Sequence, residues 1–138
     1  MKTPSDVFNS MQVILAHLND LKTHFAITAP SPSIPPAFQT TPKDLYHKTD
    51  ELLRVLKDVA ERLKLGQIEI PPTPADVEPR DIYANTNRVI HYLQLVKRRL
   101  GVSDRTKPQR ATVRVSPSHI IVEAERALQE FKRVREAL

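Results

Sequence analysis

Two stretches of 22 residues decide the fold. They read PKDLYHKTDELLRVLKDVAERL from Pro42 to Leu63 and PRDIYANTNRVIHYLQLVKRRL from Pro79 to Leu100. Aligned without gaps, they share eight residues, among them the first proline and the aspartate, tyrosine and threonine that follow it. Helical periodicity alone predicts matching apolar character, but not the same polar residues, so the stretches are copies of one unit. The unit also begins at Pro4 and Pro117, which gives four copies at steps of 38, 37 and 38 residues.

Each copy begins like a capped helix. A threonine or serine precedes the proline in three copies, which places a hydroxyl at the N-cap and the proline at the first helical position. Asp6, Asp44 and Asp81 recur at the third helical position, where a carboxylate caps free backbone N–H groups, so we interpret them as caps rather than catalytic groups. The only glycines, Gly66 and Gly101, stand where left-handed helix ends are expected. The expected helices cover residues 4–25, 42–65, 79–100 and 117–138.

Apolar residues occupy a face of three positions in every seven. One column of this face is apolar in all four copies, beginning at Val7, Leu45, Ile82 and Ile120 and recurring every seven residues. A face of this width suits a helix with two neighbours. The sequence therefore predicts an all-α protein: a single domain over residues 1–138, folded as a four-helix bundle of four single-helix repeats.

The connectors between these helices are long and rich in proline. Residues 26–41, 66–78 and 101–116 exceed the two to eight residues typical between bundle helices. In polyproline II a 13-residue connector spans about 40 Å, whereas a 22-residue helix is about 33 Å long. The connectors therefore allow parallel helices with returning linkers. We nevertheless expect an up-down arrangement, because it is the commoner one for bundles with four sequential helices.

The residue types argue against an enzyme. The chain has no cysteine, which excludes disulfides, thiolate zinc sites and cysteine nucleophiles but fits either redox compartment. Bundles build metal and haem sites from inward-facing side chains, and no Asp, Glu or His falls in the three apolar columns. We therefore expect no catalytic residue, metal or cofactor. No apolar run reaches membrane-spanning length, so we expect no membrane insertion.

Positive charge concentrates between residues 97 and 114. Seven cations there oppose the single acid Asp104, a local balance of +6 in a chain of net charge +5. Such a segment is typical of proteins with phosphate-rich or acidic partners. It has no aromatic residue for base stacking, so a solvated linker beside a negative helix end is the simpler interpretation. The candidate anion or nucleic-acid contacts are Lys97, Arg98, Arg99, Arg105, Lys107, Arg110 and Arg114.

A second group of cations lies within the helical pattern. Lys22, Lys97 and Arg135 share one column whose first two turns are apolar. Their stems are expected to cover the core while their charges reach solvent. Parallel helices would gather the three charges into an anion-binding mouth at one end of the bundle, whereas antiparallel helices would separate them.

These features predict a non-enzymatic helical interaction or scaffold domain of a larger or processed protein, with a protein partner. Two alternatives stay open. One is a nucleic-acid or anion-binding module that uses residues 97–114. The other is a small-ligand sensor bundle with a pocket near Tyr46, Tyr83, Thr49 and Thr86, although core threonines usually bond to their own helix.

Overall fold

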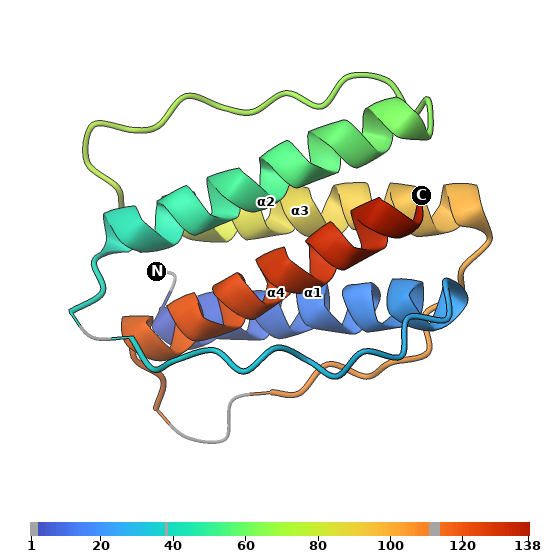
Figure 1. The fold of residues 1–138 in the computed structure, drawn as a ribbon. Coiled ribbons are helices and arrows are strands. Elements are labelled where there is room, and N and C mark those ends of the chain that lie inside the picture. The colour runs from blue at the N-terminus through green and yellow to red at the C-terminus, as the bar shows by residue number, and fades with distance from the viewer. Residues whose placement is uncertain (1–2, 38, 111–113) are drawn as a thin grey trace.

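The computed structural model describes residues 3–37, 39–110 and 114–138, which form four helices and contain no strand. The helices are α1 (Pro4–His24), α2 (Pro42–Arg62), α3 (Pro79–Leu100) and α4 (Pro117–Ala137), as Figure 1 shows. Each begins at the proline that marks its repeat, and the predicted all-α four-helix fold is confirmed. The predicted ends are confirmed for α3, whereas α2 ends three residues earlier than expected.

The helix starts use the predicted capping side chains. The carboxylate of Asp6 accepts a hydrogen bond from the backbone N–H of Thr3 at 2.8 Å, and Asp44 and Asp81 make the equivalent contact in α2 and α3. In α4 the ring Nδ1 of His119 takes this role at 3.2 Å. The three aspartates are therefore occupied by the helix ends they cap.

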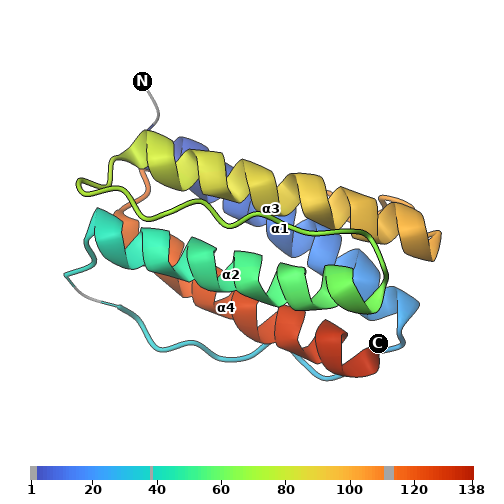
Figure 2. The same cartoon turned by 90° about the horizontal axis from the view of Figure 1, so that it is seen from above.

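All four helices point in the same direction (Figures 1 and 2). Their first turns and the residue Val115, just before α4, gather into one apolar cluster at one end of the bundle, formed by Val7, Leu45, Tyr46, Ile82, Val115 and Ile120. The expected up-down arrangement is therefore wrong, and the parallel alternative is correct. The length of the connectors permits this orientation, because an extended chain of about 16 residues spans on the order of 50 Å, more than the length of one of these helices.

The described parts of the three connections return along the outside of the bundle (Figure 1). We call them linker 1 (residues 25–41), linker 2 (63–78) and linker 3 (101–116). Linker 1 lies beside α4, where Arg133 donates to the carbonyl of Pro30 at 2.7 Å. Linker 2 runs along α2 and α3 (Figure 2), and the Tyr46 hydroxyl donates to the carbonyl of Pro72 at 3.4 Å.

Sequential helices are not always neighbours. α1 packs against α3 and α4, and α2 packs against the same two helices. α1 and α2 therefore face each other across one diagonal of the bundle, and α3 and α4 across the other (Figure 2). Each helix has two neighbours, as the width of its apolar face predicts.

The core contains the apolar column that the sequence singles out. All twelve residues of the column beginning at Val7, Leu45, Ile82 and Ile120 are buried. The threonines of a neighbouring column are buried as well. The hydroxyls of Thr49 and Thr86 each donate at 2.7 Å to the carbonyl three residues earlier in their own helix, as expected.

The first three helices end in one repeated motif. Ala26, Lys64 and Gly101 occupy the same repeat position with φ values of 54°, 56° and 71°. In each case the next backbone N–H bonds to a carbonyl five residues earlier, which is the Schellman arrangement. The prediction for Gly101 is confirmed. Gly66 also has a positive φ, of 95°, but its predicted place at the helix end is wrong, because Lys64 adopts the left-handed conformation there and closes α2 at Arg62.

These ends generate a stability prediction. Ala26→Gly and Lys64→Gly should each raise the free energy of unfolding by about 0.5–1 kcal/mol, because glycine relieves the left-handed strain of a residue with a Cβ. Gly101→Ala should lower it by a similar amount through the backbone alone, since a Cβ there meets no heavy atom within 4 Å. Urea unfolding of the three variants measures the effect, and destabilisation by both glycine variants would contradict the described helix ends.

Candidate functional site

The cations of residues 97–114 fall into two groups. Lys97 is buried, with only 2% of its surface exposed. The other six are exposed: Arg98, Arg99, Arg105, Lys107, Arg110 and Arg114. The expectation that the charge of Lys97 reaches solvent is therefore wrong, and Lys97 is not available to a partner in this conformation.

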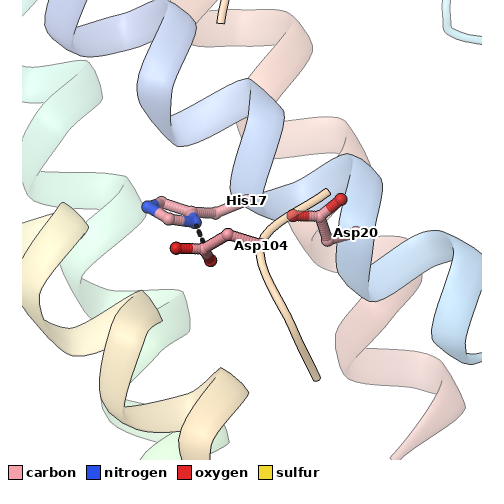
Figure 3. Close-up of side chains that lie close together, drawn as sticks. All are labelled: His17, Asp20 and Asp104. Carbon is pink, nitrogen blue, oxygen red and sulfur yellow. Dashed lines mark ion pairs between the residues drawn. The ribbon is translucent and has the colours of Figure 1, made fainter. Parts of the chain in front are cut away.

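Lys97 lies at the centre of a cluster of polar groups from α1, α3 and linker 3. Its Nζ donates to Oδ2 of Asp20 at 2.8 Å and to the carboxylate of Asp104, and lies 3.1 Å from Nδ1 of His17. Figure 3 shows His17 and Asp20 on α1 with Asp104 beside them on linker 3. These three residues place potential metal-ligand atoms within 4.8 Å of one another. The Lys97 ammonium already lies among these three residues and forms ion pairs with both carboxylates.

Asp20 attaches linker 3 to α1. Its carboxylate accepts hydrogen bonds from the backbone N–H groups of Arg105 at 3.1 Å and Thr106 at 3.0 Å, and from the Thr106 hydroxyl at 2.7 Å. Burial by itself raises the pKa of Asp20, but the hydrogen bonds from Lys97 and linker 3 outweigh it and lower the pKa from 3.8 to about 2. The carboxylate thus remains ionised at neutral pH and holds the linker in place.

His17 is buried, although no histidine of the chain falls in the three apolar columns. Burial and the adjacent Lys97 ammonium lower the pKa of His17 below 6.5, so the ring is neutral at pH 7 and its Nδ1 accepts from Lys97. His17 stands 13 residues after its repeat proline, a position also buried at Val55 and Glu130. The buried face is therefore wider than three columns. The apolar Val55 is the sequence signal for this additional column.

The other two cations of the Lys97 column are also paired. Lys22 Nζ lies 2.6 Å from Oε2 of the buried Glu130, and an Arg135 guanidinium nitrogen lies 3.7 Å from Oδ2 of Asp58. Parallel helices do bring Lys22, Lys97 and Arg135 to one end of the bundle, as expected for that orientation. Because each charge faces a carboxylate, they do not form an open anion-binding mouth.

The remaining exposed cations define a candidate interface, which we call the cationic surface: Arg98, Arg99, Arg105, Lys107 and Arg110. The first two lie in the last turn of α3, and the others lie on linker 3. None of the five forms an ion pair with a described residue of the chain. Arg114 lies apart from them, in a hollow where linker 3 approaches the start of α1.

The chain was compared with protein families, curated proteins and solved structures, and none of them matches it. Over the described ranges, none of the four helices combines the length and apolar character needed to cross a membrane.

The Lys97 cluster predicts unequal effects of removing its two main partners. Asp20→Ala should lower the free energy of unfolding by about 3–5 kcal/mol, because the buried ammonium loses a carboxylate and linker 3 loses three hydrogen bonds. Lys97→Met should cost only about 1–2 kcal/mol, because Asp20 keeps its bonds to linker 3. Urea unfolding measures both, with the exposed Arg99→Met as a control expected within about 0.5 kcal/mol of wild type. Equal losses for Asp20→Ala and Lys97→Met would refute the role of Asp20 in holding the linker.

The lowered pKa of Asp20 predicts acid sensitivity. A carboxyl with a folded pKa of about 2 and an unfolded value of 3.8 stabilises the fold above pH 3.8, and this contribution disappears as the pH falls toward 2. It amounts to on the order of 2 kcal/mol. The stability difference between wild type and Asp20→Asn, measured by urea unfolding from pH 6 to pH 2, should therefore shrink below pH 4. A difference that stays constant over this range would contradict the assignment.

Proposed function

We propose that the chain is a non-enzymatic interaction domain that binds an acidic segment of a partner protein through the cationic surface. The observation that carries the proposal is the set of five exposed cations without an ion pair to any described residue, next to a buried cluster that fixes the linker bearing three of them. A linker attached at Asp20 presents its charges with less conformational freedom than a free chain, which reduces the entropy lost on binding.

The chemistry of the buried cluster supports binding rather than catalysis. Lys97, His17 and Asp20 are all buried, and their polar groups bond mainly to one another and to linker 3. A catalytic group must reach its substrate directly or through one water. The pocket considered near Tyr46, Tyr83, Thr49 and Thr86 receives less support, because both threonine hydroxyls bond to their own helices and the Tyr46 hydroxyl bonds to linker 2.

Nucleic acid is the second candidate partner, because phosphates attract the same cations. The absence of aromatic residues between positions 97 and 114 favours an acidic peptide over exposed bases. A backbone-only contact with duplex DNA still fits the exposed arginines, so the two partners need a direct comparison.

Binding to polyglutamate and to a 20-base-pair DNA duplex at low and physiological salt tests the proposal. We expect polyglutamate to bind with an affinity that falls steeply with salt. The triple variant Arg99→Glu, Arg105→Glu, Arg110→Glu should weaken it more than tenfold, because it reverses most of the cationic surface.

The matched control is Lys43→Glu, Arg80→Glu, Lys132→Glu, which changes the net charge equally on exposed positions elsewhere. It should weaken binding less than threefold. Equal losses in the two triple variants would show a general charge effect and overturn the assigned surface. Tighter binding of DNA than of polyglutamate, lost in the first triple variant alone, would replace the acidic peptide with nucleic acid.

A further inference from the structure

A groove of about 1220 Å³ lies between α2 and α3, with linker 2 as its third wall. α2 contributes Arg54 and Lys57, and α3 contributes Arg88 and His91. Linker 2 is held along the groove by the buried side chain of Ile68 and by the bond between the Tyr46 hydroxyl and Pro72. The groove is therefore a built feature of the fold, separate from the cationic surface.

An unusual polar contact in the core leads to this groove. Asn85 is completely buried, and its Nδ2 donates to Oγ1 of Thr49 at 3.1 Å. Its Oδ1 accepts from Nη1 of the exposed Arg88 at 2.8 Å. A buried amide costs stability unless it is hydrogen-bonded, and an apolar residue would fill the same space without this requirement. The amide thus connects the core to an arginine on the groove and fixes one edge of its guanidinium.

The unpaired side chains of the groove carry two positive charges and one negative charge. Arg54 is paired with Asp50 at 3.0 Å, whereas Lys57, Arg88 and the carboxylate of Glu69 line the groove without an ion pair to a described residue. Arg88 uses one N–H on Asn85, which leaves several donors of its planar fork for another acceptor. A guanidinium fork matches the paired oxygens of a phosphate or carboxylate.

The groove also offers apolar contact. Ile70 of linker 2 and Tyr92 of α3 line it and are half-buried, and the ring of His91 lies edge-on to that of Tyr92 with centroids 5.4 Å apart. The space exceeds that of an inorganic anion. A ligand that fills it has an organic body beside its charged group.

We propose that this groove binds a small organic oxyanion, a phosphate monoester or a carboxylate, through Arg88 and Lys57, with Asn85 as a positioning residue for Arg88. The site is independent of the cationic surface and of the partner proposed for it. Its recognition depends on one oriented guanidinium and adjacent apolar contacts rather than on many charges.

Titration with phenyl phosphate and with benzoate, followed by ¹H–¹⁵N NMR, tests the proposal and separates the two oxyanion sources. We expect one or both probes to shift the Arg88 Nε–H signal and the backbone signals of residues 67–73, while neutral benzyl alcohol binds at least tenfold more weakly. Arg88→Gln should reduce affinity at least tenfold. Because Arg88→Gln also removes the guanidinium donor to the buried Oδ1 of Asn85, the thermal midpoint of this variant is measured first, and affinity is compared at a temperature where it is folded.

The Asn85→Leu variant distinguishes an effect on the orientation of Arg88 from an effect on the stability of the fold. Thr49 keeps its bond to the Tyr46 carbonyl in this variant, so the thermal midpoint should stay within a few degrees of wild type while probe affinity falls at least threefold. Arg99→Gln removes the same charge from the cationic surface and should leave affinity within twofold.

Three results would overturn the inference. They are no shift at the groove with either probe at millimolar concentration, equal losses in Arg88→Gln and Arg99→Gln, or unchanged affinity in a folded Asn85→Leu variant. Each outcome is independent of polyglutamate binding. The proposed groove ligand and the proposed partner of the cationic surface are therefore tested separately.

Discussion

Parallel alignment of four helices brings four helix N-termini to one end of the bundle and four C-termini to the other. Aligned helix dipoles repel side by side, and compensating charges at the ends reduce this cost. The repeat supplies them: Asp6, Asp44 and Asp81 lie in first turns, and Arg62 and Arg135 lie in last turns. The repeated aspartates, interpreted from the sequence as caps, thus also reduce the electrostatic cost of the parallel orientation.

Parallel alignment also requires each linker to return along the bundle and to be held there. Linker 3 uses a buried charge for this purpose. Lys97 belongs to a column with apolar character in its earlier turns, and burying its ammonium demands carboxylates close by. Asp20 and Asp104 provide them from α1 and from the linker itself. The cost of one buried cation is therefore offset by bonds that attach the linker to the helices.

The parts of this structure that follow from the sequence are local. Prolines, capping residues and the column of Val7 predict where helices start and which face is buried, because these signals act within a few residues. Helix direction is different, since up-down and parallel bundles share the same local pattern. The Lys97 cluster is even harder to predict from the sequence, because Lys97 and Asp20 are 77 positions apart and only the fold brings them together. The groove at Arg88 likewise depends on how linker 2 returns.

The helices repeat, whereas the linkers do not. Linkers 1 and 2 are rich in proline, and linker 3 carries the excess cations. One wall of the groove at Arg88 is linker 2, and three of the five residues of the cationic surface lie on linker 3. Duplication of a helix therefore supplies a closed core, and divergence of the returning segments supplies different surfaces on it. Any ligand that binds only the docked form of a linker would stabilise the folded state by mass action, so binding at either proposed surface would be thermodynamically coupled to linker docking.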